Sequence, residues 1–291
     1  MIQMRRIGHI TFETPDVERQ IDYYTNVVGL VLAGRDKHSA YLSTRVGQLA
    51  VQLDSGAEAR CTSLSFEVTP GMALNEIVRQ LTTIGIASEL RNDSAPGMKS
   101  SVTFRDPKGT VIELFCEWTF VTPCQQALGI GPMKLGHVAF AVTDTTAISD
   151  FYEQGFGFRV SDWIEDFFVF LRCNPDHHTL NFIKGEKSAL HHVAFELKDA
   201  AHLHAACDVL SQKRIPIVRG PLRHGPGHNV AIYHANPDGL VVEFFIELDQ
   251  MKDEALGYFE PKPWHRDFPQ RPKTWTRKDN GTVIWGIRTT Y

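Results

Sequence analysis

The stretch IGHITFETPDVERQIDYYTNVVGLVL, from Ile7 to Leu32, returns as LGHVAFAVTDTTAISDFYEQGFGFRV, from Leu135 to Val160. The Gly-His dipeptide and a later tyrosine, Tyr24 in the first copy and Tyr152 in the second, fall at the same offset. The rest of each half repeats as well, because SLSFEVTP in the first half matches HVAFELKD in the second. Internal repetition on this scale predicts two duplicated domains.

Each half in turn contains two similar quarters. A quarter opens with an apolar alternating strand, continues with a stretch of helical periodicity, and ends with three short strand runs separated by Gly, Pro, Asn and Asp turns. The four helical stretches are Asp16–Val27, Leu74–Ile84, Thr145–Gln154 and Ala200–Lys213. The pattern predicts an α+β fold, in which a βαβββ module is used four times. Two modules make a domain, and its mixed sheet curls around a pocket.

The repeat also suggests where the domains end. We place the first domain at residues 1–123 and the second at residues 133–250. Residues 251–291 fall outside the repeat and are rich in proline, tryptophan and basic side chains. We expect this segment to be an extended tail, packed on the surface or against a neighbouring subunit.

Composition limits the classes of partner. The 291 residues carry a net charge of −4, with 22% charged and 43% hydrophobic residues, which is ordinary for a globular protein. Neither nucleic acid nor a membrane is expected as a partner, because the chain is not basic and has no apolar run long enough to span a bilayer. Five scattered cysteines without a CxxC pair favour reduced thiols and a cytoplasmic location.

Three residues with metal-binding side chains stand at matching points of three quarters. They are His137 in LGHVAF, His192 in LHHVAFEL and Glu243 in NPDGLVVEFF. Each residue alone is better explained as a strand-end polar side chain that hydrogen bonds satisfy. Together they provide two imidazoles and one carboxylate, which hold Fe(II) on one face and leave the other open to oxygen and substrate. Mn(II) also suits this set, and a zinc hydrolase is allowed by ligand type.

The internal repeat indicates which of two adjacent histidines is the metal ligand and which half of the chain holds the metal. His191 and His192 are adjacent, and successive side chains of a strand face opposite ways. The match to His137, which also stands two residues before an alanine, favours His192 as the ligand. The equivalent positions in the first half are His9, Ser63 and Glu113. Because serine is a poor ligand for a divalent transition metal, we expect one metal per chain, in the second domain.

Three further residues fit a reaction rather than binding alone. His178 lies in a strand or in the turn that leads into one, His224 lies in a Gly/Pro-rich loop, and Tyr233 begins the turn that leads to Glu243. A histidine can take a proton from a phenolic hydroxyl and return it, and a tyrosine hydroxyl can orient a substrate oxygen. Four other histidines are expected to be structural: His177, His191, His228 and His234.

These motifs resemble those of the type I extradiol catechol dioxygenases of the vicinal oxygen chelate superfamily. The segment from His224 through Tyr233 and NPDG to Glu243 is similar to the family's active-site signature, and FLRCNPDHHTLNF is similar to the segment that carries its catalytic histidine. The resemblance implies Fe(II) held by the triplet, acid/base catalysis by His178, and hydrogen bonds to the reactants from His224 and Tyr233. It further implies a catechol-type substrate, O₂ as co-substrate, a non-catalytic first domain and a homo-oligomer.

The chain departs from the family at one point, and two other functions remain open. Members that cleave biphenyl diols commonly carry Asn-Asp after the loop histidine, whereas this chain has Pro226-Gly227, so its ring-binding pocket is expected to differ. One alternative is a glyoxalase-like isomerase or epimerase, which would use a fourth ligand from a second glutamate. The other is a metal-free protein that binds small molecules and consumes no oxygen.

Overall fold

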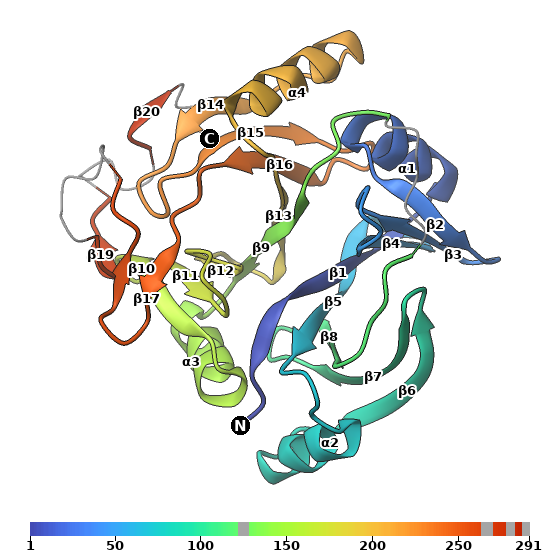
Figure 1. Ribbon diagram of the computed structural model, residues 1–291, viewed down its shortest axis with the longest axis vertical. Coiled ribbons are helices and arrows are strands. Elements are labelled where there is room, and N and C mark those ends of the chain that lie inside the picture. The colour runs from blue at the N-terminus through green and yellow to red at the C-terminus, as the bar shows by residue number, and fades with distance from the viewer. Residues whose placement is uncertain (122–127, 263–269, 278–282, 287–291) are drawn as a thin grey trace.

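The computed structural model describes residues 1–121, 128–262, 270–277 and 283–286, with the backbone alone at residues 93 and 94. Two large sheets form the molecule (Figure 1). The first has the strand order β2-β3-β4-β1-β5-β8-β7-β6. Its strands are β1 (Met4–Thr14), β2 (Val31–Arg35), β3 (Ser39–Ser43), β4 (Leu49–Ser55), β5 (Arg60–Val68), β6 (Ser88–Ala95), β7 (Met98–Arg105) and β8 (Val111–Phe115).

The second sheet repeats this order as β10-β11-β12-β9-β13-β16-β15-β14. In both sheets the two middle strands are antiparallel to each other and parallel to their outer neighbours, which is the same mixed pattern. The strands of the second sheet are β9 (Lys134–Val142), β10 (Arg159–Ile164), β11 (Phe168–Arg172), β12 (Leu180–Lys184), β13 (Ala189–Glu196), β14 (Arg219–Arg223), β15 (Val230–Ala235) and β16 (Val241–Ile246).

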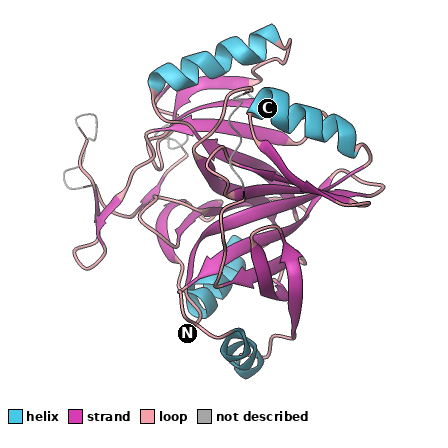
Figure 2. Ribbon diagram, turned by 45° about the vertical axis from the view of Figure 1, so that its right-hand side comes forward, coloured by secondary structure: helices cyan, strands magenta, loops and turns pink. Residues whose placement is uncertain are grey.

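Four helices lie on the outside of the sheets (Figure 2). Each follows the first strand of a quarter, so the βαβββ module predicted from the sequence occurs four times. The helices are α1 (Val17–Tyr23), α2 (Leu74–Thr83), α3 (Thr145–Phe156) and α4 (Ala200–Gln212), and α1 continues into the π-helical turn η1 (Tyr24–Val28). An aspartate caps three of them, since its carboxylate accepts backbone N–H bonds of the first turn. The α+β fold class is confirmed.

The two halves share one hydrophobic core. The rings of Phe66 and Phe158 meet edge to face at 5.8 Å, and Phe104 stacks on Phe156 at 5.1 Å, each pair joining one half to the other. Such aromatic contacts add stability beyond the area they bury. The halves are therefore fixed against each other by packed side chains.

Tyr23 at the end of α1 and Tyr152 within α3 make polar contacts across the same junction. Tyr152 donates its hydroxyl proton to Oδ2 of Asp106, at 2.8 Å, and Asp106 also pairs with buried Lys108. On the other side, the Tyr23 hydroxyl lies 2.6 Å from Nε2 of His234. Each half thus holds a turn or strand of the other half through a buried polar contact.

The tail adds strands to both edges of the second sheet. Strand β19 (Lys273–Trp275) pairs in parallel with β10, and β20 (Trp285–Gly286) pairs with β14. Strands β17 (Met251–Asp253) and β18 (Tyr258–Phe259) form a small hairpin. Strands β19 and β20 of the tail therefore extend this chain's own sheet, and residues 263–269, 278–282 and 287–291 lie outside the described residues. None of the described helices meets the length and hydrophobicity that a membrane span requires.

Candidate metal centre

Three neighbouring strands of the second sheet bring the predicted triplet together. His137 lies on β9, His192 on β13 and Glu243 on β16, and Ala194 of β13 is paired with both His137 and Glu243. The Nε2 atoms of the two histidines are 3.2 Å apart, and Oε2 of Glu243 lies 3.2 Å from His137 Nε2 and 3.1 Å from His192 Nε2. The strand register alone thus sets three donor atoms at one point.

This donor set fits a divalent metal. Three ligands at right angles around an ion, each about 2.1 Å away, stand roughly 3 Å from one another, which agrees with the three spacings above. All three side chains are buried, and Glu243 keeps a charge there. Burial raises the pKa of Glu243, but the imidazoles of His137 and His192 outweigh it, so that the pKa lies well below its usual range. Burial also lowers the pKa of His192, which favours the neutral imidazole that binds metals.

Neighbouring side chains form hydrogen-bonding contacts with two of the three candidate ligands, His192 and Glu243. His191 Nδ1 lies 2.6 Å from His192 Nδ1, and Asn229 Nδ2 donates to Oε1 of Glu243 at 3.0 Å, which leaves Oε2 for the ion. Contacts of this kind fix the ring orientation and raise the affinity of metal sites. Nδ1 of His137, by contrast, is buried without a hydrogen-bond partner.

His191, which was expected to be structural, also lines the pocket. The pairing of β13 with β9 shifts by one residue between Leu190 and His192, which is a β-bulge. Because of this bulge, His191 and His192 both line the pocket, although in a regular strand they would face opposite ways. A bulge leaves no mark in a single sequence, which is why alternation suggested only one pocket histidine.

The equivalent position in the first half is arranged differently. His9 Nδ1 contacts the Ser65 hydroxyl at 2.8 Å, and His9 Nε2 lies 3.6 Å from Glu113, which also accepts a hydrogen bond from Ser101. Ser63 pairs with Thr11 on the neighbouring strand, where the second half has His192 opposite Ala139. Within the described residues, the only cluster suited to a metal ion is that of His137, His192 and Glu243.

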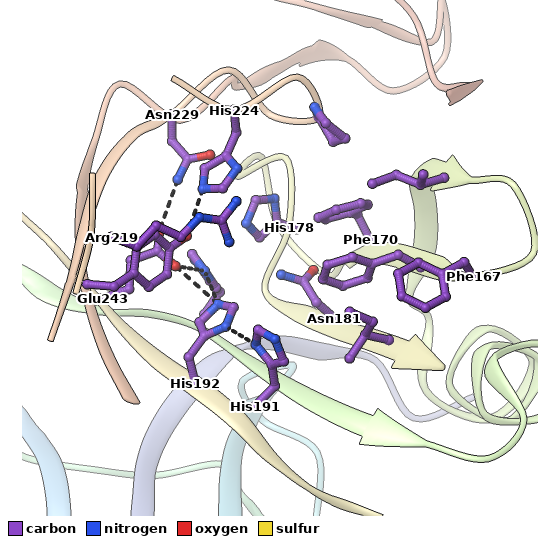
Figure 3. Close-up of a pocket in the computed structure, with 16 residues that line it drawn as sticks. Phe167, Phe170, His178, Asn181, His191, His192, Arg219, His224, Asn229 and Glu243 are labelled. Atoms are coloured by element: carbon purple, nitrogen blue, oxygen red, sulfur yellow. Dashed lines mark hydrogen bonds and ion pairs between the residues drawn. The ribbon is translucent and has the colours of Figure 1, made fainter. Parts of the chain in front are cut away.

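A pocket opens over the triplet (Figure 3). Apolar side chains line one side of it and polar side chains the other. The apolar lining residues are Ile164, Phe167, Phe168, Phe170, Ile183 and Pro226. The polar lining residues, beside the triplet, are His178, Asn181, His191, Arg219, His224, Asn229 and Tyr233. The pocket therefore combines a face suited to an aromatic ring with groups that can hold its oxygens.

The three predicted catalytic residues all line this pocket. His178 lies in the turn before β12, and its ring meets that of His137 edge to face at 4.4 Å. His224 follows β14, and its Nε2 lies 2.7 Å from the Tyr233 hydroxyl. Tyr233 does not begin a turn, as the sequence suggested, but lies within β15 directly opposite Glu243.

Burial sets the protonation of two of these groups. Burial, together with the imidazoles of His137 and His177, lowers the pKa of His178 well below its usual value. Burial likewise raises the pKa of Tyr233 well above its usual value. The pocket therefore contains a neutral imidazole that can accept a proton and a phenol that can donate a hydrogen bond.

Two further pocket residues went unnoticed in the sequence. Arg219 places its guanidinium 5.4 Å from the centre of the Tyr233 ring, and it makes no ion pair among the described residues. Asn181 lies on β12 with its Oδ1 buried and unpartnered. Each lies within a few residues of a histidine that the motifs singled out, Asn181 near His178 and Arg219 near His224, and neither belongs to a motif of its own.

Three histidines predicted to be structural have polar partners. His228 Nδ1 lies 2.6 Å from Asp249, and His234 contacts Tyr23 across the junction. His177 is wholly buried and contacts both Asp162 and His178. His228 and His234 do not line the pocket, whereas His177 is connected to it through His178.

The chain is similar to known proteins over most of its length. Residues 134–244 match the Glyoxalase/Bleomycin resistance protein/Dioxygenase superfamily, so the second half of the chain carries a domain of this superfamily. The chain is 26% identical over 265 residues to 3-methylcatechol 2,3-dioxygenase of Pseudomonas putida, covering 84% of this chain and 90% of the relative. It is 24% identical over 284 residues to a Rhodococcus jostii protein named iron-dependent extradiol dioxygenase, covering 87% and 93%.

A solved structure has the same fold. The Mn(II)-bound glyoxalase of Novosphingobium aromaticivorans superimposes with a TM-score of 0.86 at 24% identity, over 99% of this chain and 93% of that chain. The resemblance to extradiol dioxygenases that the motifs indicated is confirmed by the named relatives.

Proposed function

We propose that this protein is a metal-dependent extradiol dioxygenase, which opens the ring of a catechol-type substrate and incorporates both atoms of O₂. The observation that carries the proposal is the buried triplet of His137, His192 and Glu243 with the neutral imidazole of His178 beside it. Relatives whose names describe this activity align over most of the chain. The donor set and the buried pocket supply both a metal site and a base.

His137, His192 and Glu243 would hold Fe(II), with Mn(II) as the second candidate. Such an ion supplies open positions at which a catechol and O₂ meet, and it lowers the free energy of the deprotonated catechol. Relatives and neighbours are named for both metals, since one is called iron-dependent and another is Mn(II)-bound. Metal analysis of protein purified without added metal distinguishes the two ions.

The remaining residues handle the substrate's ring and protons. The aromatic side chains of Phe167, Phe168 and Phe170 offer a dry face for the ring. His178 takes a hydroxyl proton of the catechol and returns it when the ring opens. Tyr233 and His224, joined by their 2.7 Å contact, hold a substrate oxygen in place by hydrogen bonds. Such acid/base assistance commonly contributes about 10²–10⁴ in rate.

We also propose a division of labour along the chain. Residues 133–250 form the catalytic domain with one metal per chain, residues 1–123 form a non-catalytic repeat, and residues 251–291 form the tail. The serine at position 63 supports this division, because it stands where the second half carries His192. We further propose that the protein is cytoplasmic and forms a homo-oligomer. Sedimentation of the purified protein tests its oligomeric state.

The main alternative is an isomerase built on the same scaffold. It is favoured by the structural match to a protein described as a glyoxalase. An isomerase of this kind needs no oxygen, typically uses a fourth metal ligand, and does not require the set of His178, His224 and Tyr233, whereas the described cluster has three members. The dioxygenase is therefore the better match to the pocket.

The deciding experiment measures oxygen. Protein purified anaerobically and loaded with Fe(II) or Mn(II) is mixed with a panel of catechols, and oxygen uptake is recorded with the absorbance of ring-opened product. One O₂ consumed per catechol is expected. A fully metal-loaded protein that consumes no oxygen across the panel, yet converts a glutathione hemithioacetal, would establish the isomerase instead.

A further inference from the structure

His178 is one end of a buried chain of three side chains. Nδ1 of His177 lies 3.0 Å from Nδ1 of His178, and Nε2 of His177 lies 3.1 Å from Oδ2 of Asp162. His177 and Asp162 are both 0% exposed. Polar groups removed from water in this way must satisfy one another, so their geometry constrains which atoms carry protons.

The hydrogen bonds of the Asp162 carboxylate determine which atom donates in its contact with His177. The backbone N–H of Lys273 donates to Oδ1 at 2.9 Å, and the indole N–H of Trp275 donates to Oδ2 at 2.6 Å. Both oxygens therefore accept bonds from groups that can only donate, as an ionised carboxylate does. The contact with His177 then has His177 Nε2 as its donor.

The proton positions follow along the chain. With its proton on Nε2, neutral His177 presents a lone pair on Nδ1. The contact between the two Nδ1 atoms needs one donor and one acceptor, so Nδ1 of His178 donates. The second ring nitrogen of His178, Nε2, is left with its lone pair, and this is the atom that can accept a proton from a substrate hydroxyl.

The surrounding residues hold the two imidazoles in contact. Gly227 has a φ of +74°, and a β-carbon there would lie 3.1 Å from both His177 Nδ1 and His178 Cε1. The Phe259 ring packs against His177 at 4.9 Å. The glycine at this position, which departs from the Asn-Asp pattern of biphenyl-diol enzymes, thus leaves the room that the paired rings occupy.

We propose that Asp162 and His177 are positioning residues that fix the tautomer of His178, and that the tail strand β19 clamps this relay through Trp275. This inference rests on the proposed function, because it serves the acid/base step assigned to His178. It gives the tail a role, since two of the three residues of β19 bind the carboxylate that starts the relay.

Two near-isosteric substitutions test the relay. His177→Asn places an amide oxygen where it can accept the His178 Nδ1 proton, whereas His177→Leu has the same branching and no acceptor. We expect His177→Leu to lower kcat by about 10- to 100-fold, as loss of an orienting partner commonly does, with KM and metal content unchanged. His177→Asn should keep most of the activity, and equal losses in the two variants would overturn the proposal.

A double-mutant cycle separates the relay from simple packing. If His177 acts through His178, then His177→Leu should cost no more than about a further twofold in a His178→Ala background. The control is His9→Leu, which removes a buried imidazole from the first sheet and should leave kcat unchanged. Losses that multiply in the double variant would show that His177 acts independently of His178.

The tautomer itself can be observed without turnover. In ¹⁵N-histidine-labelled protein loaded with diamagnetic Zn(II), long-range ¹H–¹⁵N spectra should show the Nδ1–H form of His178 in the wild type and its loss in His177→Leu. A protein that has this tautomer but consumes no oxygen would refute the proposed function and leave the relay standing. An active wild type with His178 in the Nε2–H form would overturn the relay alone.

Discussion

At the scale of single residues, the pocket assigns different tasks to histidines that look alike in the sequence. His137 and His192 present Nε2 to a common point, His178 stands beside them with a lowered pKa, and His191 supports His192 through its Nδ1. In the function proposed above, one adjacent pair would supply a metal ligand and its support, His192 and His191, and the other an acid/base group and its support, His178 and His177. The distinction comes from strand register and from buried partners.

Removal of the proposed base separates binding from turnover. His178→Ala should bind one metal per chain, because the donor atoms of the triplet are untouched, and should lose about 10²–10⁴ in kcat. Metal content and oxygen uptake are measured on the same preparation. His178→Ala with wild-type turnover would remove this residue from the mechanism.

Arg219 should make the affinity for a substrate depend on the charge of that substrate. It is the only arginine among the described pocket residues and has no carboxylate partner there, so a catechol with an anionic ring substituent should bind more tightly than a neutral one. Arg219→Met should raise KM for the anionic catechol by about tenfold, which corresponds to about 1.4 kcal/mol. The neutral catechol is the internal control. An equal rise in KM for both substrates would instead place the guanidinium near the shared ring oxygens.

At the scale of elements, the sequence identifies six side chains that the fold brings to the pocket, but none of the irregularities of its strands. The sequence predicts strands at LGHVAF and HVAFELKD, and their pairing in the fold brings His137 and His192 together. The bulge at His191 and the attachment of β19 to β10 depend on long-range pairing, which no local pattern encodes. For the same reason Asp162 and Trp275 carry no visible signal, although they meet in the fold.

The tail strand can be loosened by one substitution. Trp275→Phe keeps the ring but removes the donor to Asp162, and a hydrogen bond to a charged group contributes about 1.5–3 kcal/mol. We expect faster hydrogen exchange in β19 and a lower kcat, with metal content unchanged. Trp118→Phe, in the first half, is the matched control. Unaltered exchange in β19 would show that pairing with β10 alone retains the tail.

The position in the first half that corresponds to the metal site should contribute neither to metal binding nor to activity. Ser63→Ala alters the position that matches His192, and we expect it to leave the metal content at one per chain and the activity unchanged. Elemental analysis with oxygen uptake measures both. A fall in metal content would assign the first sheet a part in metal binding.

At the scale of the whole molecule, duplication produces two sheets that brace each other. The contacts of Tyr23 and Tyr152 and the shared hydrophobic core join the two halves, and among the described residues only the second half carries a cluster suited to a metal ion. The repeated sequence predicts the two sheets, but not the polar contacts between them. Tyr23 and His234 lie 211 residues apart in the chain, and only the packing of the sheets brings them together.

The Tyr23–His234 contact should make stability depend on pH. Burial lowers the pKa of His234 to about 4, whereas the unfolded chain has its usual value near 6.5. Between these values the unfolded state binds more protons, so the stability that is fully present above pH 6.5 is lost as the pH falls towards 4. The loss is up to about 3 kcal/mol.

Urea unfolding at several pH values between 7.5 and 4.5 measures this dependence. His234→Gln keeps a partner for the Tyr23 hydroxyl but does not titrate, so its stability should fall less steeply than that of the wild type. Parallel curves for the two proteins would exclude His234 as the source.

The attachment of β19 has a consequence for how the protein is made. Synthesis runs from the N-terminus, and Trp275 follows Asp162 by 113 positions. A nascent chain that has passed Glu243 already contains every proposed metal ligand and every proposed catalytic residue, yet the Asp162 carboxylate beside His177 still lacks its indole partner. A product truncated between Glu243 and Trp275 would therefore contain all three candidate metal ligands but lack the residue proposed to hold Asp162, and we expect it to bind metal with a lowered kcat.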